Sequence, residues 1–169
     1  MRIVYKILSL TSLFIPLSSP SYSHTIAPPT LREQSAPFVA TPYPSANLAH
    51  TQVQQAFVLA AKTHRNVLLD FGGNWCPDCK MLAGVFELPD AKKWLDQNFV
   101  LVPINVEKFN TNLDIPQKYN VSITAVPTVL IITPNGHLLN QNDAETLGNA
   151  RAMSPQAVIN LIAEWDNRQ

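Results

Sequence analysis

The sequence predicts an α/β fold, in which a central mixed β-sheet is flanked by helices on both faces. Helix-like and strand-like patterns alternate along most of the chain, and the apolar run Asn66–Gly72 (NVLLDFG) is typical of a buried central strand. The chain has 169 residues, of which 46% are hydrophobic and 14% charged. This is the size and apolar content of one globular domain.

Residues 1–23 have the layout of a secretory signal peptide. Arg2 and Lys6 give a positive start, residues 7–17 are apolar, and small residues occupy the −3 and −1 positions of a cut after Ser23. The apolar run is shorter than the roughly 20 residues that span a bilayer, so we expect cleavage and no stable membrane insertion. The mature product is therefore predicted to be periplasmic or secreted, where disulfides persist.

A proline-rich segment, residues 24–45, precedes the domain, which we predict at 46–169. Prolines lack the backbone donor that helices and sheet interiors need, so this segment is predicted to be a mobile or wrapped arm. One short edge strand is expected within it, at residues 37–41.

Within the domain, caps, apolar spacing and turn residues predict the elements in order. They are a helix capped by Asn47 that ends near His64; a strand at Asn66–Gly72; helices at 77–85 and 90–98; a strand at 99–106; a short helix at 114–119; a strand at 128–133; a hairpin strand at 137–140, after the turn at 134–136; and a helix capped by Ser154 that ends near Trp165. Pro103 lies in the strand at 99–106 and cannot donate to a ladder, which favours an edge or bulged position for that strand.

Charge and cysteine content exclude several classes of protein. Lys and Arg total 12, and so do Asp and Glu, so nothing favours nucleic-acid binding. The chain holds two cysteines, too few for a disulfide scaffold or a four-cysteine zinc site.

The two cysteines, Cys76 and Cys79, stand in the stretch NWCPDCK, directly after the central strand and at the start of a predicted helix. Unpaired N–H groups and the helix dipole favour a thiolate at the first helical position. This lowers the pKa of Cys76 and predicts that it is the nucleophile, with Cys79 shielded one turn further on. Two thiols at this spacing can also close a small disulfide that opens readily by exchange.

The two thiols could also bind a metal ion or form a purely structural disulfide. A metal site needs two further ligands, and no histidine is paired at ligand spacing among His24, His50, His64 and His137. A purely structural disulfide that closes so short a loop stabilises little. Redox chemistry is therefore favoured, and no metal is predicted. A copper or zinc carrier and a non-catalytic binding module remain as alternatives.

Asp70 and Trp75 are further candidate site residues. Asp70 lies inside the predicted central strand, where partial burial would raise its pKa and suit it to exchange a proton with Cys79 through water. In the alternative, Asp70 ends a frayed strand and faces solvent. Trp75 is predicted to cover one side of the site and bind substrate, although an aromatic residue at such a junction can also serve packing alone.

Pro77, Asp78 and Lys80 are predicted to modulate the dithiol. A carboxylate at Asp78 opposes thiolate formation at Cys76 by charge repulsion, which favours a reductant over a strong oxidant. In the alternative, the Asp78 side chain points to water and has little effect. Lys80 is expected to be a solvated charge.

Val126 and Pro127 are the other predicted substrate-binding residues. Proline permits a cis peptide bond, and a cis-proline beside the dithiol would turn the Val126 backbone outwards. An extended substrate segment could then pair with it as an added strand.

Together these motifs resemble the thioredoxin-fold family over residues 47–165. The resemblance rests on VLLDF at 67–71, WCPDCK at 75–80, AVPT at 125–128, the turn PNG at 134–136 and Gly148. Within the family the chain is similar to exported thioredoxin-like proteins described as disulfide isomerases, and to the C-terminal domain of the transmembrane thiol:disulfide interchange reductase. The resemblance implies that Asp70 is the family's buried acid and Pro127 its cis-proline.

The chain departs from the family at three places. Asp78 replaces the histidine that oxidases and isomerases commonly have, and thioredoxin has Gly-Pro at Pro77 and Asp78. Gly72 replaces an aromatic residue, which predicts a more open site. Residues 108–116 look inserted.

The predicted function is an exported thiol–disulfide oxidoreductase, a reductase or isomerase, that acts on protein thiols and disulfides. The redox centre is the Cys76–Cys79 pair, and no dissociable cofactor is implied. The dithiol must therefore be recharged by another redox protein, such as a membrane electron carrier.

Overall fold

The computed structural model describes residues 26–168. The predicted signal peptide and the first residues of the arm lie outside this range. No helix within residues 26–168 is both long and apolar enough to cross a membrane.

The centre of the fold is a mixed sheet, as predicted, and it has three strands in the order β2-β1-β3. Its strands are β1 (Asn66–Gly72), β2 (Phe99–Asn105) and β3 (Thr128–Ile132). β1 runs parallel to β2 and antiparallel to β3. The apolar run predicted to be the central strand therefore lies between the other two strands. β2 lies at the edge, which is one of the two positions that Pro103 predicted.

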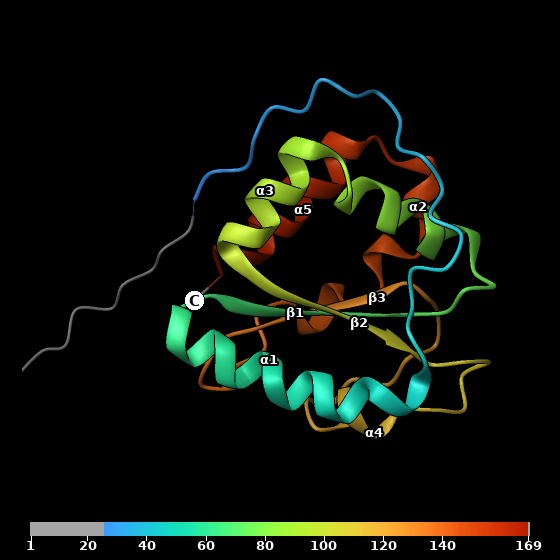
Figure 1. Ribbon diagram of the computed structural model, residues 1–169, viewed down its shortest axis with the longest axis vertical. Coiled ribbons are helices and arrows are strands. Elements are labelled where there is room, and N and C mark those ends of the chain that lie inside the picture. The colour runs from blue at the N-terminus through green and yellow to red at the C-terminus, as the bar shows by residue number, and fades with distance from the viewer. Residues whose placement is uncertain (1–25, 169) are drawn as a thin grey trace, which may run out of the picture.

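Helices cover both faces of the sheet (Figure 1). One face carries α1 (Ala49–Thr63) and α4 (Asp114–Gln117), and the other carries α2 (Pro77–Phe86), α3 (Pro89–Asn98) and α5 (Pro155–Asp166). Side chains alternate along β1, so Leu68 packs in the core of α2, α3 and α5, and Leu69 packs in the core of α1. Because neither face of β1 is solvated, its sequence is almost continuously apolar.

Of the two helix caps predicted from the sequence, one is correct and one is wrong. Ser154 caps α5, where its hydroxyl accepts a hydrogen bond from the Ala157 N–H at 3.2 Å, as predicted. Asn47 does not cap α1. It lies inside a 3-10 turn, Ala46–Leu48, that leads directly into α1, and no side chain caps either segment. Two further 3-10 segments follow β3, at Gln141–Asp143 and Thr146–Ala152.

The hairpin strand predicted at 137–140 is wrong. After the turn only one isolated bridge connects the chain to β3. The amide of Asn140 then takes the place of a strand: it accepts a hydrogen bond from the Ile131 N–H at 2.9 Å and donates one to the Val129 oxygen at 2.8 Å. A side chain thus satisfies backbone groups that a paired strand would otherwise satisfy. The other helices and strands predicted within residues 46–169 are present, and their ends differ by at most about two residues.

The described part of the arm, residues 26–45, wraps over the helices (Figure 1). The Trp94 indole of α3 donates to the Ile26 oxygen at 2.7 Å, and the Leu31 N–H donates to the Gln156 side chain of α5 at 2.7 Å. These contacts tie the arm to both helices.

The edge strand expected at residues 37–41 is absent. This segment instead follows α2, where the Val39 N–H donates to the Lys80 oxygen at 3.1 Å. The arm therefore approaches a helix and has no strand beside it to pair with.

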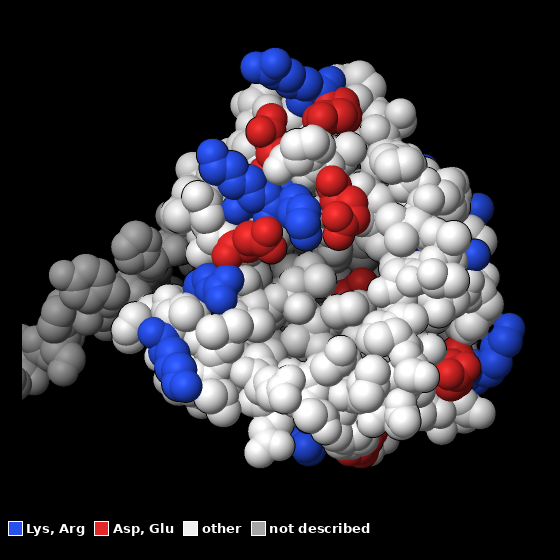
Figure 2. All heavy atoms as spheres, viewed as in Figure 1, with Lys and Arg blue, Asp and Glu red and all other residues white. Residues whose placement is uncertain are grey.

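Charged side chains of both signs are interspersed on the face shown in Figure 2. This distribution agrees with the equal totals of 12 basic and 12 acidic residues. It gives no support to a nucleic-acid footprint on that face.

Candidate active site

The dithiol lies at the start of α2, directly after the loop that follows β1. Cys76 and Cys79 form a disulfide, and Cys76 is the N-cap of α2, with Pro77 at the first helical position. The Cys76 Sγ accepts a hydrogen bond from the Cys79 N–H at 3.1 Å. Cys79 is fully buried and Cys76 is 4% exposed. This is the geometry on which the prediction of a nucleophilic Cys76 and a shielded Cys79 depends.

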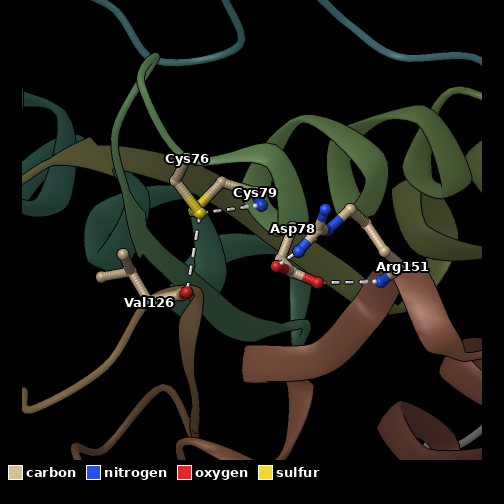
Figure 3. Close-up of polar contacts among 5 residues, drawn as sticks. All are labelled: Cys76, Asp78, Cys79, Val126 and Arg151. Carbon is tan, nitrogen blue, oxygen red and sulfur yellow. Dashed lines mark hydrogen bonds and ion pairs between the residues drawn. A yellow bond between two sulfur atoms is a disulfide. The ribbon is translucent and has the colours of Figure 1, made fainter.

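The Val126–Pro127 peptide bond is cis, as predicted, and faces the dithiol. The Val126 oxygen lies 3.5 Å from the Cys76 Sγ (Figure 3). A substrate sulfur that attacks or leaves Cys76 would therefore have the Val126 backbone beside it. The binding role of Val126 and Pro127 stays a prediction.

Glu145 fixes the loop before the cis-proline, and sequence reasoning missed it. Its carboxylate accepts hydrogen bonds from the N–H groups of Thr124, at 2.6 Å, and Ala125, at 3.0 Å. These bonds lower the pKa of Glu145, although burial acts against them. The residue could not be chosen from the sequence, because its partners Thr124 and Ala125 lie 21 and 20 positions away.

Asp70 is buried in β1 and only 2% exposed, so the alternative of a frayed strand end is wrong. Burial raises the pKa of Asp70 from its usual 3.8 to about 7, and a hydrogen bond from Tyr43 acts in the opposite direction. The predicted burial and raised pKa are thus present. The role as proton acceptor stays a prediction.

Tyr43, at the end of the arm, is the partner of Asp70 that the sequence did not reveal. Its hydroxyl lies 3.0 Å from each carboxylate oxygen of Asp70. A Cβ built on Gly72 would lie 2.2 Å from this hydroxyl and 2.9 Å from the Cys79 Sγ. The prediction of a more open site at Gly72 is therefore wrong, because Tyr43 fills the space from outside the core motif.

Asp78 differs from both predicted arrangements. Its two carboxylate oxygens accept hydrogen bonds from the backbone N–H and the Nε of Arg151, each at 3.0 Å (Figure 3). The side chain is 14% exposed and does not point to water. The guanidinium is a counter-charge that offsets repulsion between Asp78 and a Cys76 thiolate.

Trp75 lies at the surface beside Cys76 and is 40% exposed. Its indole N–H donates to the Glu107 oxygen, its ring lies 5.6 Å from the Phe109 ring, and the Lys108 Nζ lies 4.6 Å from its centroid. Glu107 and the first two residues of segment 108–116, which looked inserted, thus hold this side chain in place. The indole is positioned to border the site, and its contact with substrate stays a prediction.

Lys80 is partly exposed on α2, and no ion pair involves it within residues 26–168. Its backbone oxygen accepts the hydrogen bond from the Val39 N–H of the arm. Nor do three or more His, Cys, Asp or Glu side chains gather at metal-binding distance within this described range.

A dithiol at the start of the helix after the central strand, opposite a cis-proline and above a buried acid, defines the thioredoxin class of redox proteins. Comparisons with known proteins agree. Residues 53–143 match the family described as thioredoxin-like domain. The chain therefore belongs to the thioredoxin-like domain family.

Individual relatives point the same way. A solved structure of a disulphide isomerase from Xylella fastidiosa Temecula1 is 32% identical, has a TM-score of 0.69, and is matched over 73% of this chain and 95% of that one. Protein disulfide-isomerase from Triticum aestivum is 28% identical over 62% of this chain, and a thioredoxin from Rickettsia bellii is 33% identical over 41%. This chain covers 20% of the length of the wheat protein and 60% of the Rickettsia one. These homologues support a thiol:disulfide oxidoreductase activity.

Proposed function

We propose that this chain is an exported thiol–disulfide oxidoreductase, a reductase or isomerase, that acts on protein disulfides. The observation that carries the proposal is the Cys76–Cys79 disulfide at the start of α2, with the Val126 oxygen 3.5 Å from the Cys76 Sγ. Export is inferred from the signal-peptide pattern of residues 1–23.

The reaction starts from the reduced dithiol. The Cys76 thiolate attacks one sulfur of a substrate disulfide, which forms a Cys76–substrate disulfide and releases the other substrate sulfur as a thiolate. Cys79 then gives its proton to Asp70 and attacks the Cys76 Sγ. The second substrate sulfur leaves as a thiolate, and the two substrate thiolates take up one proton from Asp70 and one from solvent. The substrate is then a dithiol, two electrons richer, and the Cys76–Cys79 disulfide remains.

Asp70 suits this step because its pKa of about 7 lets it both accept and release a proton near neutral pH. Another protein must return two electrons to the disulfide, because the chemistry uses no dissociable cofactor. A membrane electron carrier would fulfil this role for a protein outside the cytoplasm.

The reduction potential tests the redox direction. The negative charge of Asp78 favours a reductant, but Arg151 offsets that charge. The reduction potential can be determined by equilibration with glutathione. A value near about −270 mV supports a reductase, and one between about −180 and −120 mV supports an isomerase or oxidase.

A trapping experiment tests the function itself. Cys79→Ala removes the resolving thiol, so mixed disulfides between Cys76 and client proteins should accumulate and disappear on reduction. The matched control, Cys76→Ala with Cys79→Ala, should form none. Adducts absent from the single variant, together with a wild-type disulfide that does not exchange with glutathione, would leave only a binding module.

A further inference from the structure

We propose that Tyr43 is a positioning residue for the dithiol: its hydroxyl holds the Asp70 carboxylate beside Cys79 and sets the pH range in which Asp70 accepts the Cys79 proton. This inference rests on the proposed function, and it assigns a mechanistic role to the N-terminal arm.

The contact is direct and enclosed. Tyr43 is 3% exposed, and its hydroxyl proton is shared between two Asp70 oxygens that each lie 3.0 Å away. Alternation along β1 places Asp70 and Gly72 on the same face of the strand. The hydroxyl and the Cys79 Sγ both border the position that a Gly72 Cβ would occupy. The acid, the phenol and the resolving cysteine therefore meet in one small volume.

The backbone of Tyr43 is tied to the loop that carries the dithiol. Its N–H donates to the Asn74 Oδ1 at 3.0 Å, and the Asn74 Nδ2 donates to its oxygen at 2.9 Å. Asn74 lies two positions before Cys76, so the arm and the redox loop are fixed to each other. This reciprocal pair makes the position of the hydroxyl part of the site geometry.

A second close approach holds the arm nearer its middle. A Cβ built on Gly84 of α2 would lie 1.7 Å from the Pro37 oxygen, so the arm backbone passes where only glycine leaves room. Gly72 and Gly84 thus both lack side chains where the arm docks. The docked arm is built into the domain and is not an incidental contact.

The groups around Asp70 leave Tyr43 as its main electrostatic partner. The neighbouring strands place Pro103 and Val129 beside it, and neither titrates. Within residues 26–168, burial and the Tyr43 hydrogen bond are the two influences on the pKa of Asp70. Burial raises the pKa of Asp70, and the Tyr43 hydrogen bond stabilises the carboxylate and limits the rise.

Tyr43 itself remains a donor. Burial, and then the nearby charge of Asp70, raise the pKa of Tyr43 well above its usual value near 10. The phenol therefore keeps its proton at neutral pH. Without this hydroxyl the pKa of Asp70 would rise further, so less of the carboxyl would be ionised and able to accept the Cys79 proton at neutral pH.

Tyr43→Phe tests the inference, because it keeps the ring over Gly72 and removes the hydroxyl. A hydrogen bond to a charged group is lost, so the carbon-13 NMR titration midpoint of the Asp70 carboxyl should rise by about one to two pH units. The matched control is Tyr119→Phe, which removes a partly buried hydroxyl that no contact connects to Asp70. It should leave the midpoint unchanged.

The second readout is the resolution step. The reduced protein is treated with 5,5′-dithiobis(2-nitrobenzoate), and the release of thionitrobenzoate from Cys76 by Cys79 is followed against pH. In Tyr43→Phe this profile should move to higher pH by the same amount as the NMR midpoint. Asn74→Ala, which loosens the arm and keeps the hydroxyl, should shift both readouts in the same direction by less.

The outcomes separate the two proposals. An Asp70 midpoint that does not change in Tyr43→Phe overturns the role of Tyr43, whatever the activity. A shifted midpoint with an unshifted release profile also overturns it, because Tyr43 would then not act on resolution. Wild-type protein that releases no thionitrobenzoate at any pH overturns the proposed function instead, and the NMR titration still tests the contact.

Discussion

The two sides of the disulfide place a carboxylate in opposite surroundings. On the inner side, Asp70 is buried in β1 and has one neutral partner, Tyr43. On the outer side, Asp78 lies near the surface and has a charged partner, Arg151. On the inner side, loss of solvation dominates the energy of the Asp70 carboxylate, and one hydrogen bond offsets part of that cost. On the outer side, solvent and the Arg151 guanidinium both stabilise the Asp78 carboxylate. Changes on the inner side should therefore have much the larger effects.

The largest effect is expected from Asp70→Asn, which removes the buried charge. The pKa of Asp70 is near 3.8 when unfolded and about 7 when folded, so unfolding releases a proton between these values. Stability must therefore fall as the pH rises from about 4 to about 7. The shift of roughly three pH units corresponds to about 4 kcal/mol at most, which Asn should recover at pH 8 but not at pH 4.

Urea unfolding at both pH values measures this difference. The pKa of Asp166 is also raised by burial, to about 6, but it is present in both proteins and cancels in the comparison. Equal stabilisation at pH 4 and pH 8 would show that Asp70 does not titrate as its surroundings require.

The docked arm of the inner side can be tested through Gly84→Ala. The new Cβ overlaps the Pro37 oxygen, and this overlap should lower the free energy of unfolding by about 1–3 kcal/mol. The better helix propensity of Ala, about 1 kcal/mol, offsets part of this loss. Urea unfolding and limited proteolysis of the arm are the measurements. Gly148→Ala is the control, since nothing lies within 4 Å of its Cβ position, and a variant as protease-resistant as wild type would contradict the docking.

The smallest effect is expected on the outer side, from Arg151→Gln. Asp78 then keeps its charge without a counter-ion, so the pKa of the Cys76 thiol in the reduced protein should rise, by less than about one unit, and less at high salt. The pH dependence of alkylation at low and high salt measures it. Arg168→Gln, whose ion pairs are with Asp143 and Glu164, is the control. An effect larger than that of Tyr43→Phe on Asp70 would reverse the comparison.

Local signals were sufficient for most of the fold. The apolar run of β1, the cap at Ser154 and the proline in β2 each act through neighbouring residues, so the sequence alone placed them correctly. The hairpin strand failed because Asn140 competes with the backbone for β3, and a turn signal carries no information about such a side chain.

The site divides in the same way. Cys76, Cys79, Asp70 and the cis bond before Pro127 follow from motifs that are short in sequence. Tyr43 and Arg151 do not, because they reach the dithiol from 27 residues before Asp70 and 73 residues after Asp78. Because neither residue could be predicted, two predictions about the site are wrong: an open site at Gly72 and an unopposed charge at Asp78. Contacts between distant segments need the folded chain.

Asn140 also affects how one molecule meets another. β3 is an edge strand, and unpaired edge groups are a template for pairing with a second chain. Here the Ile131 N–H and the Val129 oxygen are already bonded to the Asn140 amide, and the Val129 N–H donates to the Ala144 oxygen at 2.8 Å. The opposite edge, β2, is interrupted by a proline. The sheet thus ends at three strands, and both of its edges offer a second chain little free backbone with which to pair.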